Sequence, residues 1–394
     1  MRTDVSRRSF MAAGLTAASA ARVAGANERI RLGIIGTGDR GKFLMSEANK
    51  AGNIQWVGVC DAWDVRQNEA MKLTGPDVDK YTDYRRLLER PDIDAVIVAT
   101  WDNTHAQITV DACRAGKDVY VEKPMTSRPE QGPPVVRAVR ETGRIVQVGV
   151  QQRSTPHFLE AKQRFFDSGQ IGEVHLVRTI WNHNTGYLSK PPAGMESKPE
   201  GLDWEACLGS LPRVSWDPKR YFNRFSYLDL CCGQTGGLFV HQVDVAQWYL
   251  GISKPVSAVA LGGIYQYDDG RDTPDNINLI LDYANKLNVT FEASLTDTVP
   301  LESADIVFVG SGGRLHIFRY GYRFLPAGTR TQDGALMAKG TPDEHMKNWL
   351  DCVRSRKEPN ATAEQGHYSA AACHIGNIAY FEKNRVTWDS TWDI

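Results

Sequence analysis

A short apolar run that breaks into three glycines constrains this chain more than any other feature. Residues 29–41 read Arg-Ile-Arg-Leu-Gly-Ile-Ile-Gly-Thr-Gly-Asp-Arg-Gly, so that Gly36, Gly38 and Gly41 form a G-x-G-x-x-G pattern. At a turn from a strand into a helix, the first glycine permits the tight turn and the second lets the backbone approach a pyrophosphate. The third lets the helix pack against the strand, and the phosphates meet free N–H groups at the helix N-terminus. The pattern predicts a dinucleotide site that includes Thr37 and Arg40.

An acidic residue follows the next buried strand. The run from Gln55 to Cys60 is apolar enough for a second strand, and Asp61 stands at its carboxyl end. In this place an acid accepts a hydrogen bond from the 2′-hydroxyl of an adenosine ribose. A carboxylate there would repel the extra phosphate of NADP. The sequence therefore favours NAD as the cofactor over NADP.

The first part of the chain alternates between strands and helices. We expect strands at 30–35, 55–60, 95–99, 118–121 and 145–149, with helices between them. Apolar strands separated by helices form a parallel, doubly wound sheet, and ligands bind outside the carboxyl ends of its strands. We therefore assign residues 27–150 to an NAD-binding domain of the Rossmann type, in an α/β fold.

Polar residues follow two of these strands. Thr100-Trp-Asp-Asn-Thr-His105 comes after one strand, and Glu122-Lys-Pro-Met125 comes after another. An ammonium group at Lys123, with its pKa lowered by partial burial, would polarise a substrate hydroxyl, and Glu122 would bond ribose hydroxyls. The alternatives are a solvated surface lysine at Lys123 and a structural hydrogen bond at His105.

The pattern changes after Val150, where mixed structure replaces the regular alternation. A helix is expected at 156–168 and a strand at 173–181, followed by a proline-rich loop from Lys190 to Glu200. Aromatic residues surround this loop, and they would suit either a stacking platform for a sugar ring or a packed core. They are Trp181, Tyr187, Trp204, Trp216, Tyr221 and Phe222.

The stretch from Gly233 to Gly251 reads as a helix that ends at a glycine. His241, Asp244 and Trp248 share one face by helical spacing. A carboxylate one turn from an imidazole fixes its tautomer and raises its basicity, which suits a general base. The alternative is a core helix with one hydrogen-bonded histidine.

From Val256 onward apolar residues alternate with a period of two. We expect strands at 258–267, 276–283, 287–294, 306–310 and 313–318, in a large, open and mainly antiparallel sheet. One face of such a sheet needs a cover and the other is a natural subunit interface, so we expect a homo-oligomer. Helices at 344–354 and 366–383 are expected to pack back on the first domain. Residues 151–394 would thus form an α+β domain for substrate binding and oligomerisation.

The first residues have the features of an export signal. Ser6-Arg-Arg-Ser-Phe-Met11 precedes an alanine-rich segment and Ala24-Gly-Ala26, a cleavage site of small residues. Residues 1–26 therefore resemble a twin-arginine signal peptide, and we expect a periplasmic or otherwise exported protein. No apolar stretch of the mature chain is long enough to span a bilayer.

Charge and cysteine content restrict the partners of the chain. A formal net charge of -1 over 394 residues argues against a nucleic-acid surface. The seven cysteines contain no C-x-x-C pair, and their odd number leaves at least one thiol without an intramolecular partner. No set of Cys, His and carboxylates has the spacing of metal ligands, so no metal is expected.

Several segments together resemble the glucose-fructose oxidoreductase, inositol dehydrogenase and MocA (Gfo/Idh/MocA) family. They are the glycine motif, Val96–Thr100 with Asn103 and His105, Ala115–Pro124, the His241 helix, and Trp349–Pro359. The resemblance implies that Lys123 is catalytic and that the second domain is an open sheet used for oligomerisation. It also implies that Glu122 and the Thr100–His105 segment lie at the nucleotide.

The predicted site follows from the motifs and this resemblance together. The catalytic residues are Lys123, His241 and Asp244, and the residues at the cofactor are Gly36, Thr37, Gly38, Arg40, Gly41, Asp61, Thr100, Asn103, His105, Glu122, Lys123 and Gln151. Many dehydrogenases of the family have an Asp one turn before the catalytic His, where this chain has Gly237. Either Asp244 or Asp229 takes over the role of that acid, or the chemistry differs.

These expectations lead to hydride transfer from a hydroxyl-bearing carbon of a sugar, glycoside or cyclitol. Because free nicotinamide nucleotides are scarce outside the cytoplasm, an exported enzyme would retain its NAD and restore it either within its own catalytic cycle or by reducing a second saccharide. One alternative is an NAD-dependent glycoside hydrolase that oxidises, eliminates and reduces again. A second alternative is a sugar sensor that binds the nucleotide without turnover.

Overall fold

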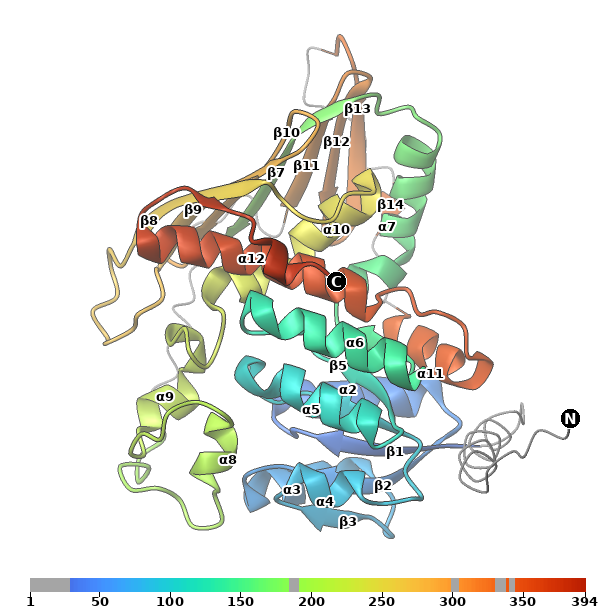
Figure 1. The fold of residues 1–394 in the computed structure, drawn as a ribbon, viewed down its shortest axis with the longest axis vertical. Coiled ribbons are helices and arrows are strands. Elements are labelled where there is room, and N and C mark those ends of the chain that lie inside the picture. Colours follow the sequence, from blue (N-terminus) through green and yellow to red (C-terminus); the bar gives the residue numbers. More distant parts are fainter. Residues whose placement is uncertain (1–28, 184–190, 299–304, 330–337, 340–343) are drawn as a thin grey trace, which may run out of the picture.

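The computed structural model describes residues 29–183, 191–298, 305–329, 338–339 and 344–394. The proposed signal segment and Tyr187 lie outside these ranges. Within them the chain forms two sheets, one at each end of the molecule, with helices packed between and around them (Figure 1).

The first sheet has six parallel strands in the order β3-β2-β1-β4-β5-β6, as expected for a doubly wound Rossmann sheet. Its central strands are buried on both faces, and Leu32, Ile34 and Ile97 are fully enclosed. The short strand β3 was missed because its residues are mostly exposed and polar. The strands are β1 (Ile30–Ile35), β2 (Ile54–Cys60), β3 (Asp79–Tyr81), β4 (Ala95–Val98), β5 (Asp118–Val121) and β6 (Val146–Val148).

Helices connect these strands and cover both faces of the sheet (Figure 1). The prolines at 133 and 134 lie in the first turn of α6, as predicted, because a proline has no N–H to lose there. The left-handed Gly143 ends the same helix. The helices are α2 (Asp39–Ala51), α3 (Asp64–Ala70), α4 (Tyr84–Leu88), α5 (Asp102–Arg114) and α6 (Gly132–Thr142).

The second sheet has nine strands in the order β14-β13-β12-β11-β7-β10-β9-β8-β15. Strands β7 and β10 pair in parallel and the other neighbours pair antiparallel, which confirms the predicted open, mainly antiparallel sheet. The strands are β7 (Val174–Asn182), β8 (Ser257–Gly263), β9 (Asn276–Tyr283), β10 (Leu287–Ser294), β11 (Asp305–Gly310), β12 (Gly313–Phe318), β13 (Gly321–Pro326), β14 (Ala338–Lys339) and β15 (Val386–Thr387).

The two faces of this sheet differ in their cover. One face packs against α10 (Val240–Leu250) and α12 (Ala363–Glu382), and Gly376 of α12 leaves room for the side chain of Leu279. The other face carries exposed apolar side chains, among them Leu261 at 80% exposure and Ile280 at 43%. A helix α7 (Pro156–Ala161) with the π-turn η4 (Lys162–Asp167) flanks the sheet near β13.

The end of the chain returns to the first domain, as predicted. Helix α11 (His345–Ser355) packs against α2, and its fully buried Trp349 meets the ring of Tyr120 on β5 at 5.7 Å between centroids. Helix α12 begins with a capping box in which the side chains of Thr362 and Gln365 bond each other's backbone N–H groups. Helix α12 contacts α6 and β6 of the first domain as well as β8 and β9 of the second sheet, so the tail lies against both domains.

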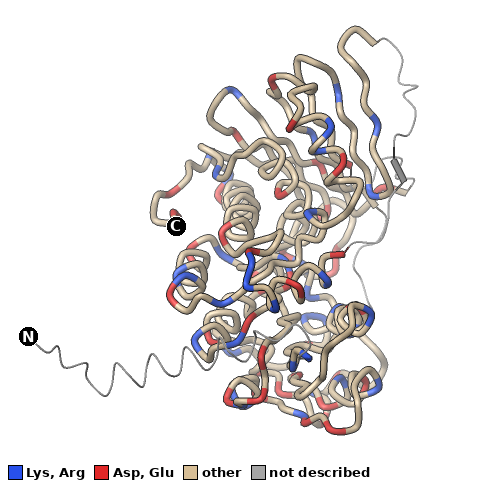
Figure 2. Tube along the Cα trace, turned by 90° about the vertical axis from the view of Figure 1, so that its right-hand side faces the viewer, with Lys and Arg blue, Asp and Glu red and all other residues tan. Residues whose placement is uncertain are grey.

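Basic and acidic residues are interspersed over both domains (Figure 2). Among the described residues no helix combines the length and apolar character that crossing a membrane needs. The same residues contain no group of three or more His, Cys, Asp or Glu side chains arranged to hold a metal ion. The cysteines are free thiols, and all but Cys207 are buried.

Candidate functional site

The glycine turn between β1 and α2 has the geometry that its motif predicts. Gly36 has a φ of +92°, and a Cβ there would lie 2.6 Å from the backbone of Ala99. A Cβ on Gly41 would lie 2.1 Å from the Gly36 carbonyl oxygen, whereas a Cβ on Gly38 would meet nothing within 4 Å. Helix α2 has no side-chain cap at its N-terminus. The turn therefore leaves open space beside helix N–H groups, which fits the pyrophosphate of a dinucleotide.

Asp61 is fixed at the carboxyl end of β2 by three hydrogen bonds. Its carboxylate accepts from the N–H of Thr37 at 2.6 Å, from the hydroxyl of Thr37 at 3.1 Å and from the N–H of Trp63 at 2.9 Å. Burial raises the pKa of Asp61, and these hydrogen bonds oppose the effect. The acid is therefore held rigidly beside the glycine turn, where a ribose of the cofactor would lie.

Glu122 at the end of β5 is engaged within the protein. One of its oxygens accepts from Nε of Arg40 at 2.7 Å, and the other accepts from the N–H of Lys123 at 3.1 Å. Only 4% of the residue is exposed. The structure thus gives Glu122 an additional role beyond the predicted contact with ribose, because it joins the glycine-turn helix to the strand end that carries Lys123.

The predicted segment after β4 contributes two different kinds of contact. His105 braces two loops, since its Nδ1 lies 2.8 Å from the carbonyl oxygen of Pro124 and its Nε2 lies 3.1 Å from that of Thr100. Asn103 donates to the carbonyl oxygen of Leu208 at 2.9 Å. Its own Oδ1, like Oε1 of Gln151, is buried without a hydrogen-bond partner in the described part of the chain. These two oxygens fit a polar ligand at this edge of the sheet.

Lys123 reaches from the first domain into the second. Its Nζ donates a hydrogen bond of 2.6 Å to the carbonyl oxygen of Gly237. Gly237 belongs to the π-turn η6 (Thr235–Phe239), which leads directly into α10. His241 stands four residues later, one helical turn onward, so that the ammonium group and the imidazole belong to the same site.

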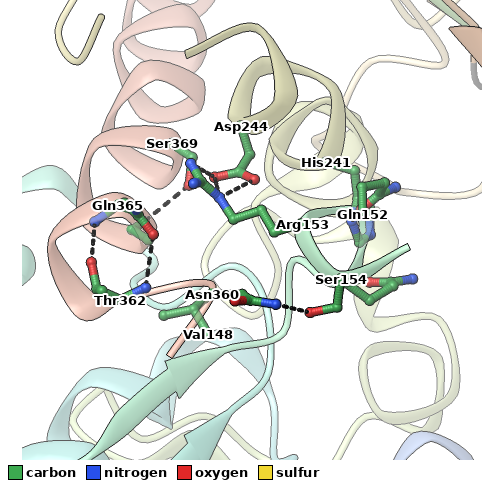
Figure 3. A network of polar contacts seen from close by, with 12 residues as sticks. Val148, Gln152, Arg153, Ser154, His241, Asp244, Asn360, Thr362, Gln365 and Ser369 are labelled. Atoms are coloured by element: carbon green, nitrogen blue, oxygen red, sulfur yellow. Dashed lines mark hydrogen bonds and ion pairs between the residues drawn. The ribbon is translucent and has the colours of Figure 1, made fainter. Parts of the chain in front are cut away.

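His241 is held by a residue that the sequence analysis did not identify. Its Nδ1 lies 3.0 Å from Oε1 of Gln152 (Figure 3). Its ring stacks on Trp181 at 6.2 Å between centroids. Because an amide oxygen accepts, Nδ1 carries the proton and Nε2 keeps its lone pair. Burial lowers the pKa of His241 well below its ordinary value, and the charge of Lys123 lowers it further. The imidazole is therefore neutral near pH 7 and able to accept a proton.

Asp244 does not fix the tautomer of His241, and that prediction is wrong. Its carboxylate instead makes a bidentate ion pair with Arg153, with contacts of 2.8 to 3.0 Å, and both side chains are almost completely buried (Figure 3). Leaving a buried carboxylate without a cation costs more free energy than leaving a neutral imidazole without a carboxylate. Asp244 therefore pairs with the arginine. Asp229, the other acid considered, is partly exposed and pairs with Arg220.

Gln152 and Arg153 follow Gln151 in the 3-10 turn η3 (Gln151–Ser154), directly after β6. The next residue, Ser154, accepts a hydrogen bond from Asn360 at 3.0 Å (Figure 3). Its hydroxyl also bonds Nδ1 of His345 at 2.7 Å. The rule that ligands lie at the carboxyl ends of parallel strands applies to this segment too. That rule was the available signal for Gln152.

Most of the predicted aromatic platform is packed core. Trp204 is 5% exposed and meets Trp216 edge-on at 5.3 Å between centroids, and Trp216 meets Tyr221 at 5.5 Å. These rings therefore pack against one another. Trp181 differs, because it lies half-buried beside His241, and among the members of this set that the structure describes it alone has a ring contact with a predicted catalytic residue.

Curated relatives match the first part of the chain. An inositol 2-dehydrogenase from Gluconacetobacter diazotrophicus is 33% identical over 153 residues, which are 38% of this chain and 44% of that protein. The scyllo-inositol 2-dehydrogenase (NAD(+)) of Bacillus subtilis is 33% identical over 147 residues, 37% of this chain and 42% of its own length. The match thus spans less than half the length of these relatives.

Solved structures share the fold over nearly the whole chain. A levoglucosan dehydrogenase in complex with NADH and levoglucosan has a TM-score of 0.69 at 17% identity, covering 91% of this chain and 99% of that one. An aldose-aldose oxidoreductase from Caulobacter crescentus has a TM-score of 0.70 at 17% identity, covering 92% and 100%.

Two models of one family match separate parts of the chain. The model described as "Oxidoreductase family, NAD-binding Rossmann fold" matches residues 30–150, and the model of the GFO/IDH/MocA C-terminal domain matches residues 213–316. Together they cover more than half of the chain, including the glycine turn, Lys123 and His241. The chain belongs to the Gfo/Idh/MocA family.

Proposed function

We propose that this protein is an NAD-dependent oxidoreductase that acts on a hydroxyl group of a sugar, glycoside or cyclitol. One observation carries the proposal. The hydrogen bond from Lys123 to the Gly237 carbonyl sets a cation one helical turn from the neutral imidazole of His241, at the ligand-binding edge of a Rossmann sheet. The activities named for the inositol dehydrogenases and for levoglucosan dehydrogenase support this substrate class.

Each of the two side chains has a distinct task in this reaction. Nε2 of His241 takes the proton of the substrate hydroxyl, since Gln152 occupies Nδ1. The ammonium of Lys123 stabilises the negative charge that develops on the substrate oxygen. Bound NAD would accept the hydride from the carbon that bears this oxygen. Trp181 lies beside His241 and offers an aromatic face to a sugar ring.

The residues of the first domain that would hold the cofactor are those of the glycine turn, Asp61, Asn103 and Gln151. Asp61 favours NAD, because its Oδ1, which accepts from the N–H of Trp63, has a second lone pair for a ribose hydroxyl, while the charge of the carboxylate would repel a 2′-phosphate. The protein therefore discriminates against NADP through one side chain.

The N-terminal sequence supports export by the twin-arginine route, which carries folded proteins. A cofactor loaded before export has to be retained and restored in place. A second saccharide that accepts the hydride would restore it, and so would re-reduction of the same substrate after elimination of its glycosidic group. We further propose a homo-oligomer that covers the exposed apolar face with Leu261 and Ile280.

The experiment is a cofactor assay on purified protein with a panel of sugars, glycosides and cyclitols. We expect NAD in the protein and an NADH absorbance band when a substrate is added. We expect Lys123→Met and His241→Ala to lower kcat by about a hundredfold or more while NAD stays bound. The exposed Lys357→Met serves as the matched control.

Three outcomes are informative. A band that disappears on addition of a second carbonyl compound supports coupled oxidoreduction, whereas release of an aglycone without net NADH identifies the glycosidase cycle. Bound NAD with no reduction by any substrate, and no effect of the two substitutions on sugar binding, would overturn the enzymatic proposal in favour of a sensor.

A further inference from the structure

A segment of the second domain lies across the first domain at two places. Residues 201–222 carry α8 (Trp204–Leu208) and α9 (Pro218–Phe222), and Figure 1 shows these helices beside the first domain, away from the large sheet. The segment is far from β1 to β6 in sequence. Its contacts fall on the loops that follow β2 and β4, the two strands on either side of β1, and on the first turns of the helices that come after these loops.

The first contact is with the loop after β2, next to Asp61. Trp63 and Leu202 form an antiparallel bridge, supported by a hydrogen bond of 2.8 Å from the N–H of Asp203 to the carbonyl oxygen of Ala62. Gly201 approaches so closely that a Cβ there would lie 2.4 Å from the carboxyl group of Asp64. The segment is thus tied through its backbone to the loop that carries Asp61.

The second contact is with the first turn of α5, the helix that follows β4. Asn103 donates to the carbonyl oxygens of Leu208 at 2.9 Å and of Cys207 at 3.3 Å. A Cβ on Gly209 would lie 2.7 Å from the side chain of Thr104, so this approach is also close. The two loops are therefore held by one continuous segment of the other domain.

An aromatic side chain joins the two contacts. The ring of Tyr221 meets Trp63 at 5.8 Å and Trp101 at 5.4 Å between centroids, and Trp63 and Trp101 come from the two different loops. Burial raises the pKa of Tyr221, and the positive charge of Arg66 nearby opposes this rise. In a Rossmann sheet the adenosine half of a dinucleotide binds at the carboxyl ends of these strands, where Asp61 lies.

We propose that residues 201–222 cover the adenosine end of the cofactor groove as a clasp, and that this clasp sets the rate at which the cofactor dissociates. Tyr221 is the side chain that holds the clasp against both loops. To release an adenosine, the segment has to separate from one of the two loops and lose the contacts of Tyr221. This inference rests on the proposed function in one respect, the identity of the ligand as NAD. It supplies a structural basis for the cofactor retention that export requires.

The test measures dissociation of bound NAD in the full chain. Protein loaded with radiolabelled NAD is diluted into excess unlabelled NAD, and the label that remains bound is followed over time. We expect slow exchange in the wild type and exchange about tenfold to a hundredfold faster in Tyr221→Ala, because the variant loses both ring contacts. Tyr221→Phe keeps the rings and separates their effect from that of the hydroxyl. Tyr265→Ala removes an exposed tyrosine on the second domain and is the matched control.

Ligands that contain only part of NAD show which half of the cofactor the clasp holds. Tyr221→Ala is expected to accelerate dissociation of ADP-ribose as much as that of NAD, and to leave the affinity for nicotinamide mononucleotide unchanged. Unchanged NAD dissociation in a folded Tyr221→Ala variant would overturn the clasp, and so would equal effects on both halves of the cofactor. These readouts do not need turnover, so an inactive protein with a Tyr221-dependent exchange rate would contradict the proposed function alone. An active protein with rapid exchange would contradict the clasp alone.

Discussion

The Nζ atom of Lys123 lies 2.6 Å from the carbonyl oxygen of Gly237, although 114 residues separate them in the chain. This contact joins the end of β5 in the first domain to the π-turn that precedes His241 in the second. The resemblance to the family leads to the expectation of an acid where this chain has Gly237. At this position the backbone carbonyl accepts a hydrogen bond from the lysine, and no side chain is available to do so.

Adjacent glycines in the π-turn η6 are expected to respond differently to an added methyl group. A Cβ on Gly237 would meet nothing within 4 Å, whereas one on Gly236 would lie 2.1 Å from Cβ of Cys232. Gly237→Ala should stabilise the protein slightly or leave it unchanged, and Gly236→Ala should lower the free energy of unfolding by about 1 to 3 kcal/mol. Denaturant unfolding measures both, and an equal loss in the two variants would contradict the packing described for this turn.

Gln152 is expected to control the pH dependence of the reaction through His241. A carboxylate in Gln152→Glu would raise the pKa of His241, opposing the effects of burial and of Lys123 that lower it. Since the imidazole acts in its neutral form, the acidic limb of the kcat/KM profile should move to higher pH by about one unit. Gln170→Glu places the same charge on an exposed surface and should not move it. Superimposable profiles would show that Gln152 does not orient the histidine.

The ion pair of Arg153 and Asp244 is expected to serve stability. Asp244→Asn leaves a buried guanidinium without its counterion and should lower the free energy of unfolding by about 3 to 5 kcal/mol. The double variant Arg153→Met with Asp244→Leu should recover part of this loss, because neither charge remains buried. Glu89→Gln breaks an exposed pair with Arg86 and should cost at most about 0.5 kcal/mol. A shift in the pH–rate profile of Asp244→Asn without loss of stability would instead favour the catalytic role expected from the sequence.

Buried histidines are expected to make the protein acid-sensitive. Burial lowers the pKa values of His345 and His374 to about 4, so both are neutral in the folded protein while the unfolded chain titrates near its ordinary value of 6.5. At pH values between these two pKa values the unfolded state binds more protons than the folded state. The free energy of unfolding therefore falls as the pH falls. Lowering the pH from about 7 to about 5 should reduce the free energy of unfolding by about 2 kcal/mol for each imidazole.

Urea denaturation at both pH values checks this prediction. His374→Gln should show a smaller loss between the two values than the wild type, by about the contribution of one imidazole. The exposed His175→Gln is the control and should follow the wild type. An acid sensitivity that neither His374→Gln nor His345→Gln reduces would place its origin elsewhere.

The sequence by itself determined the first domain and the position of its ligand edge. The glycine turn, Asp61 and the apolar strands are local signals, because a tight turn and a buried parallel strand each demand particular residues within a few positions. The period-two alternation of apolar residues also predicted strands of the second sheet. Four of them, β9 to β12, lie within one residue of their predicted bounds. Short edge strands such as β3 and β15 were not predicted, since their few exposed residues carry no period.

Only the tertiary structure decided which polar side chains face one another. Helical spacing placed Asp244 beside His241, but Arg153 comes within reach of the carboxylate from 91 residues away and pairs with it. Gln152 lies beside the imidazole because the turn after β6 packs next to α10 in the folded protein. The segment at 201–222 likewise reaches the loops of β2 and β4 only because the second domain packs against the first. Such pairings depend on distances across the assembled fold and on the cost of leaving a buried charge unpaired, and no local pattern in the chain encodes either.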